Sequence, residues 1–157
     1  LRVGLATAKG LAFALGLPLV GVPTLEAEAY PYALTRLPVC PMLRFGRDQV
    51  AWAVFQLQDQ RWLKLREEQV TSMGEMWAQV DRHSVFCGPA APRLVGGLGP
   101  DVIGAQVRPE AACRAAVAAE LAWQRLERGD RDDPATLQPL YLRPPAITIP
   151  KPQRKDA

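Results

Sequence analysis

Small residues recur at helical spacing along the start of the chain. Two rows repeat at every fourth position: Gly4, Ala8, Ala12 and Gly16 form one row, and Ala6, Gly10 and Ala14 form the other. Residues four apart share one face of an α-helix, and a face of glycine and alanine lets another backbone approach closely. Gly16, followed by Pro18, predicts the end of this helix.

The pattern changes after this helix. Residues 19–22 form a short apolar run with β-branched members, which predicts a buried strand. Thr24 is predicted to cap a new helix, with Glu26 in its first turn. Pro31 and Pro38 then mark a connection into a second part of the chain.

The middle of the chain is dominated by strand patterns. Strands are predicted at residues 39–45, 49–58 and 61–66, with turns at 46–48 and 59–60. In the third strand, the alternation predicts that Leu63 and Leu65 face inward. Lys64 and Arg66 are accordingly expected to face outward.

Two helices and two short strands are predicted beyond this hairpin. Ser72 and Glu75 match a capping box, and an apolar stripe at helical spacing follows them. The stripe comprises Met73, Met76, Trp77 and Val80. Short strands are predicted at 84–87 and 102–107, with a glycine-rich loop at 96–100, and the clearest helix at 109–128.

The composition fits one domain with a sizeable core. The chain has 157 residues, of which 48% are hydrophobic, and its net charge of +3 does not mark a nucleic-acid binder. Three cysteines, Cys40, Cys87 and Cys113, are far apart and form no C-x-x-C pair. This spacing indicates reduced thiols, with Cys87 in a buried strand and Cys113 on a helix.

Few residues form a candidate catalytic or metal-binding group. His83 is the single histidine, which excludes a metal site built on histidines and predicts a solvated or helix-capping residue beside Asp81. Asp130, Asp132 and Asp133 could bind a cation, although a solvated acidic loop is the favoured interpretation.

Other polar and aromatic positions are expected to have structural roles. Glu67 and Glu68 are predicted to lie on the surface. Trp52, Phe55 and Trp62 are predicted to pack in the core or the sheet rather than to stack on nucleic-acid bases. Lys151, Arg154 and Lys155 form a small basic cluster in a proline-containing tail, which is expected to be solvated.

Two N-terminal segments carry a family resemblance. Residues 1–12, LRVGLATAKGLA, and 17–27, LPLVGVPTLEA, match motifs of the TsaB family nearly throughout, with Pro23 replacing the usual serine. Residues 139–143, PLYLR, resemble its terminal P-x-Y-L-R motif. Arg44 and Gly46 depart from the family's D-A-R. The chain therefore resembles TsaB proteins, the non-catalytic partners of the tRNA threonylcarbamoyladenosine transferase TsaD.

The resemblance implies an α/β fold of the actin/Hsp70/sugar-kinase type, built from two RNase H-like lobes. Residues 1–22 are expected to supply the last helix and strand of the first lobe, and residues 23–38 a connection. Residues 39–145 are expected to form a nearly complete second lobe, and 146–157 a basic tail. Most of the first lobe is expected to be missing, because the chain lacks an initial Met and begins just after the family's glycine-rich run.

The resemblance also implies a function without catalysis. A TsaB-like chain is expected to be cytoplasmic, to need no cofactor, and to bind a TsaD-type transferase. A TsaE-type ATPase, a second copy of the chain, and tRNA held through the complex are further expected partners. The first helix contributes to dimer contacts in such proteins, so contacts are expected at Leu1, Leu5, Ala8, Lys9 and Ala12. The alternative is that this face of the helix packs only inside its own lobe.

Two alternatives remain open at this point. One is a catalytic relative of the same fold, either a nucleotide-using enzyme or a glycoprotease-type peptidase. The other is a secreted domain, because Arg2 and Lys9, an apolar run, and Ala27-Glu28-Ala29 imitate a signal peptide. The break at Gly16-Leu17-Pro18 argues against the signal peptide. The run is also shorter than the roughly 20 apolar residues that span a bilayer.

Overall fold

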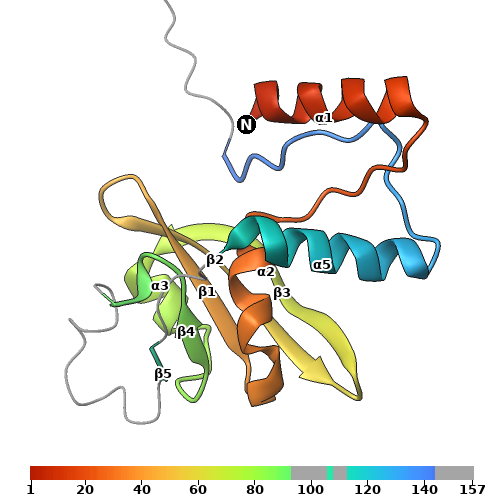
Figure 1. Cartoon of the computed structure of the whole chain (residues 1–157). Coiled ribbons are helices and arrows are strands. Elements are labelled where there is room, and N and C mark those ends of the chain that lie inside the picture. The colour runs from red at the N-terminus through yellow and green to blue at the C-terminus, as the bar shows by residue number, and fades with distance from the viewer. Residues whose placement is uncertain (93–105, 108–112, 144–157) are drawn as a thin grey trace, which may run out of the picture.

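The computed structural model describes residues 1–92, 106–107 and 113–143 (Figure 1). Its helices are α1 (Arg2–Leu15), α2 (Thr24–Ala29), the 3-10 helix η1 (Tyr30–Thr35), α3 (Met73–Trp77) and α5 (Arg114–Glu127). Its strands are β1 (Val39–Phe45), β2 (Gln49–Gln58), β3 (Arg61–Ser72), β4 (Val85–Cys87) and β5 (Gln106–Val107).

The strands form one mixed sheet in the order β3-β2-β1-β4-β5. β1, β2 and β3 are antiparallel neighbours, whereas β4 pairs in parallel with β1, and β5 with β4. The turn between β2 and β3 has positive φ at both Asp59 and Gln60, as a two-residue hairpin turn of type I′ requires. The predicted hairpin is therefore confirmed, even though it contains no glycine.

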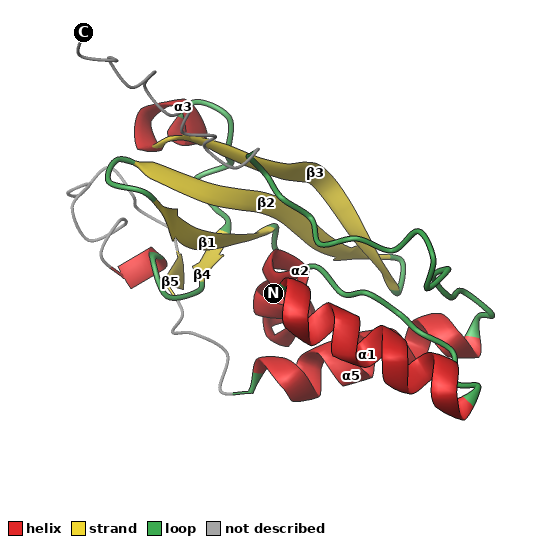
Figure 2. Ribbon diagram, turned by 90° about the horizontal axis from the view of Figure 1, so that it is seen from above, coloured by secondary structure: helices red, strands yellow, loops and turns green. Residues whose placement is uncertain are grey.

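Helices cover both faces of this sheet (Figure 2). On one face, Met76 and Val80 pack with Trp52 and Phe86. The predicted capping box between Ser72 and Glu75 starts α3 on this side, so its helical stripe is confirmed. On the other face, residues of α2 and η1 pack against a second apolar cluster, and α5 lies against α2.

The predicted strand at residues 19–22 is wrong. Only Leu19 pairs, in an isolated bridge with Asp132. A strand needs a ladder of backbone hydrogen bonds, but the backbone groups of Gly21 bond to side chains instead. Its N–H donates to Asp132 Oδ2 at 2.7 Å, and its carbonyl accepts from Arg125 at 2.9 Å.

The predicted cap of α2 is also wrong by one position. Thr24 is the first helical residue rather than the N-cap, which is Pro23, and no side chain caps this helix. Pro23 has φ −60 and ψ 139, an extended conformation that directs the chain into the helix. Glu26 does lie in the first turn, as predicted.

Strand β3 differs from its prediction in length and in orientation. It continues to Ser72, and Leu63 and Leu65 are exposed rather than buried. Trp62 packs instead, with its ring 5.6 Å from that of Phe55. β3 lies at the edge of the sheet and its pairing with β2 contains register shifts, so simple alternation does not give the covered side.

Several remaining predictions fall partly outside the described residues. The glycine-rich loop at 96–100, the tail at 146–157 with its basic cluster, and the first residues of the helix predicted at 109–128 all lie there. Cys113 is the exposed N-cap of α5, whereas Cys87 lies in buried strand β4 as predicted. Among the described residues, no helix is long and apolar enough to cross a bilayer.

Candidate protein-binding surface

Helix α1 exposes several large apolar side chains. Phe13 is 89% exposed, and Val3, Leu11 and Leu15 are also exposed. None of the residues that the structure describes covers these side chains. Exposed apolar patches of this kind mark sites of interaction with other molecules.

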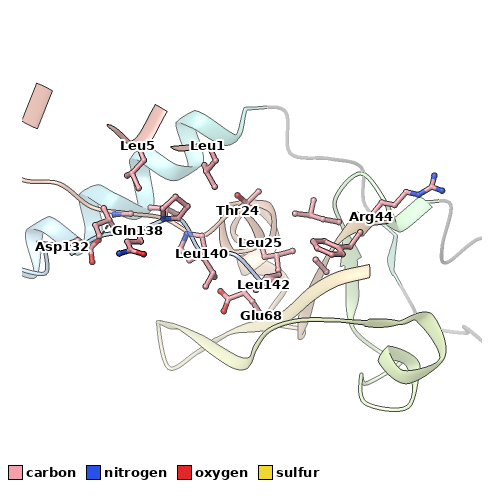
Figure 3. A pocket seen from close by; sticks show the side chains of 18 residues that line it. Leu1, Leu5, Thr24, Leu25, Arg44, Glu68, Asp132, Gln138, Leu140 and Leu142 are labelled. Carbon is pink, nitrogen blue, oxygen red and sulfur yellow. Dashed lines mark hydrogen bonds between the residues drawn. The ribbon is translucent and has the colours of Figure 1, made fainter. Parts of the chain in front are cut away.

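The contact residues predicted from the sequence lie mainly on the opposite side of α1. Leu5, Ala8 and Lys9 are half-buried, and Ala12 is only 6% exposed. Leu1, at the end of the chain, is exposed. Figure 3 shows Leu1 and Leu5 above the segment that contains Leu140. The structure thus gathers these residues on the side of α1 that faces the rest of the chain.

The two rows of small residues differ in their surroundings. A Cβ atom added at Gly4 or Gly10 would meet no atom within 4 Å. Ala6 and Ala14 are exposed beside Gly10, whereas Ala12 is buried. The row that contains Gly10 is therefore open to the approach of another backbone.

The C-terminal segment ties α1 to the rest of the chain. Arg2 Nε donates a hydrogen bond to the Tyr141 hydroxyl at 3.0 Å, and the guanidinium lies 5.3 Å from the ring centre. Two residues later, Arg143 donates to the Gln49 side chain and lies over the Phe45 ring. The segment that resembles P-x-Y-L-R thus links α1 to the turn between β1 and β2.

Arg125 of α5 organises the acidic loop that follows it. Its guanidinium lies 2.7 Å from Asp130 and 3.5 Å from Asp132. The hydrogen bond from Arg125 lowers the pKa of Asp130, and Asp130 in turn raises the pKa of Arg125. Asp130 and Asp132 are therefore ion-pair partners of Arg125. Among the described residues, no group of three His, Cys, Asp or Glu side chains is arranged to hold a metal ion.

The remaining candidate residues are either exposed to solvent or packed in the core. His83 is exposed, with Nδ1 3.3 Å from Asp81 Oδ1, as expected for a solvated histidine. The hydrogen bond from the His83 backbone lowers the pKa of Asp81. Trp52 and Phe55 are buried in the sheet, which confirms their predicted packing role.

Two buried carboxylates depart from what the sequence suggests. Glu68 was expected on the surface together with Glu67, but its side chain is only 6% exposed. Glu28 is fully buried on α2, where Oε1 accepts a hydrogen bond from Arg114 of α5 and Oε2 has no partner. In the sequence, the signal for burial of Glu28 is its position between Ala27 and Ala29. Both alanines are buried in the structure.

Comparison with known proteins adds a family and a fold. Residues 1–86 match the family model of TsaD, tRNA N6-adenosine threonylcarbamoyltransferase. No curated protein sequence matches the chain.

Two solved structures from Pseudomonas aeruginosa are similar. One is an uncharacterized protein with similarity to peptidase YeaZ, with a TM-score of 0.71 and 22% identity over 90% of this chain and 67% of that chain. The other is YeaZ, with a TM-score of 0.64 and 22% identity over 89% of this chain and 67% of that chain. Their likeness confirms the predicted mixed α/β fold of the RNase H-like type. The TsaD family model matches residues 1–86, which are more than half of the chain. The chain therefore belongs to the TsaD family, and this confirms the family-level resemblance drawn from its motifs.

Proposed function

We propose that this chain is a non-catalytic, TsaB-type subunit that binds a TsaD-type transferase. In this role it supports threonylcarbamoyladenosine modification of tRNA next to the anticodon. It contacts tRNA only as part of the complex. A TsaE-type ATPase is the proposed third partner, and the proposed compartment is the cytoplasm. Family membership and the TsaB-like motifs support this role.

The observation that carries the proposal is the exposed apolar side of α1. Val3 and Phe13 have no cover among the described residues, and Gly10 leaves room for a second backbone. A surface of this kind is stabilised when a partner buries it, because each Å² of apolar area removed from water contributes roughly 25 cal/mol. We therefore place the contact on α1, with the open side central to it.

Pull-down of a TsaD-type protein from the same source, using the tagged chain, tests the proposal. Phe13→Asp is expected to weaken binding at least tenfold, because it places a charge in the centre of the proposed contact. Lys9→Glu probes the side that carries the contact residues predicted from the sequence. Trp123→Asp is the matched control, since Trp123 is an exposed aromatic residue on α5.

Each result separates the alternatives. If only Phe13→Asp abolishes binding, the result supports a contact on the open side of α1. If only Lys9→Glu abolishes binding, the contact lies instead on the side that carries Leu1, Leu5, Ala8 and Ala12. Equal loss with Trp123→Asp contradicts a contact on α1. If no variant and no wild-type chain binds, while the chain alone hydrolyses nucleotide or peptide, the catalytic alternative replaces the proposal. Light scattering of the free chain shows whether α1 pairs two copies instead.

A further inference from the structure

A cavity of about 640 Å³ opens beside the turn between β1 and β2. Three stretches of the chain line it: Arg44 and residues 47–49 around that turn, residues 72–74 at the start of α3, and residues 89–90 after β4. This volume falls within the roughly 300–1,000 Å³ of typical small-molecule sites. The space is therefore large enough for a small organic ligand.

Backbone contacts hold two of these stretches in place. The Ala90 N–H donates a hydrogen bond to the Met42 carbonyl at 3.3 Å, which fixes the chain after β4 against β1. The capping box between Ser72 and Glu75 fixes the start of α3. A Cβ atom added at Gly74 would meet no atom within 4 Å, so this wall borders open space.

Two arginines of the wall have donors to spare. Arg44 Nε donates to the Gly46 carbonyl at 3.3 Å, and this bond leaves the terminal nitrogens of its guanidinium free of that contact. In Figure 3, the Arg44 guanidinium points away from the pocket drawn there. Within the described part of the chain, neither Arg44 nor Arg47 forms an ion pair with a carboxylate. Both guanidiniums can therefore bind an anion that the chain itself does not supply.

Gln49 adds a third donor to the same wall. Arg143 donates to Gln49 Oε1, and the Arg143 guanidinium lies 5.3 Å from the centre of the Phe45 ring. The carboxamide oxygen of Gln49 is thus engaged, whereas its NH₂ group can only donate. The groups that Arg44, Arg47 and Gln49 can offer to a ligand are therefore all donors.

The charges around this cavity also favour an anion. Its lining contains two arginines and one carboxylate, Asp48. Glu75, next to the wall, already accepts hydrogen bonds from the Ser72 N–H and hydroxyl. Arg44 stands where the D-A-R motif has its aspartate, so this chain carries a positive charge in place of a negative one. The net positive charge attracts a negatively charged group.

We propose that this cavity binds the phosphate group of a small organic phosphate. The guanidiniums of Arg44 and Arg47 donate to the phosphate oxygens, because the planar fork of arginine matches phosphate geometry. The organic part lies against Met73 and Pro89, which line the same space. No residue of α1 lines this cavity, so the site does not depend on the proposed binding of a transferase.

Calorimetric titration of the whole chain with phenyl phosphate, in a buffer free of phosphate, tests this assignment. Phenyl phosphate is expected to bind at one site, at least tenfold more tightly than phenol, and benzylammonium is expected not to bind. Arg47→Gln should weaken phenyl phosphate binding at least tenfold. Arg61→Gln is the matched control, because it removes the same charge from an exposed arginine at the start of β3, outside the cavity wall. Arg44→Asp, which introduces the aspartate of the D-A-R motif, should abolish binding.

Four outcomes would overturn the proposal. They are equal affinity for phenyl phosphate and phenol, equal loss in the Arg47→Gln and Arg61→Gln variants, no binding by the folded wild-type chain, and binding of single-stranded RNA without binding of phenyl phosphate. If an arginine variant fails to fold, Gly74→Trp replaces it, since a bulky ring at this open position should occlude the cavity. Undiminished phenyl phosphate binding by folded Gly74→Trp would likewise refute the site.

Discussion

Removing Arg114 should destabilise the chain strongly, because it leaves a buried carboxylate without its partner. Glu28 is fully buried on α2 and its Oε1 accepts from Arg114 Nε, while its Oε2 has no hydrogen-bond partner. Breaking a buried ion pair from one side typically costs about 3–5 kcal/mol. Arg114→Met keeps most of the apolar stem, so the loss of the charge dominates the effect.

A double-mutant cycle isolates the pair. Arg114→Met alone is expected to lower the free energy of unfolding by about 3 kcal/mol, which corresponds to a fall in Tm of roughly 6–12 °C for a chain of this size. In a Glu28→Met background the same change should cost much less, because no unpaired charge remains. Interactions of Arg114 with other residues appear in both backgrounds and cancel in the cycle.

Urea unfolding followed by circular dichroism at pH 7 measures all four members of the cycle. Arg128→Met is the control, since Arg128 is an exposed arginine at the end of the same helix, and its change should stay within about 0.5 kcal/mol. If Arg114→Met also stays within that range, or if the two substitutions are additive, the reasoning about the buried pair is wrong.

Three further predictions concern thiols, a glycine and a carboxyl. A thiol reagent at pH 8 should modify Cys113 alone in the native chain and all three thiols in denaturant, because burial raises the pKa of the other two; three rapid native reactions would contradict this. Gly88→Ala should lower the free energy of unfolding by about 1–3 kcal/mol, since its φ is +90 and a Cβ would lie 2.9 Å from the Met42 carbonyl oxygen. Gly74→Ala, in open space on α3, should instead be neutral or stabilising. Glu26→Gln should raise stability at pH 7, because burial raises the pKa of Glu26 above 4.5 and so disfavours its ionised native form. That gain should disappear as the pH falls below the unfolded pKa, and a gain that persists at pH 3 in urea unfolding would refute it.

The local elements were predictable because short-range geometry specifies them. The capping box at Ser72 and the stripe of α3 involve residues three or four apart. The strands β1 and β2 appear at their predicted residues, since each is a run of apolar and β-branched side chains bounded by a turn. Gly16 ends α1 with φ 63, a conformation that glycine adopts without strain.

Orientation and burial were not predictable in the same way. Alternation in β3 separates Leu63 from Lys64, but only the neighbouring strand and its register shifts decide which of the two is covered. Residues 19–22 have the composition of a strand, yet their backbone groups bond to Asp132 and Arg125, which lie over a hundred positions away in sequence. Glu67 and Glu68 are adjacent and identical in type, and the fold buries only one of them.

By itself, the sequence determined the start of α3, the end of α1, the strands β1 and β2 and the family, because these depend on periodicity, on capping residues and on motifs of consecutive positions. The tertiary structure alone decided which side of α1 stays open and which carboxylates are buried. Burial depends on what packs against a residue, and that neighbour is set by the path of the whole chain rather than by the residue's own surroundings in sequence.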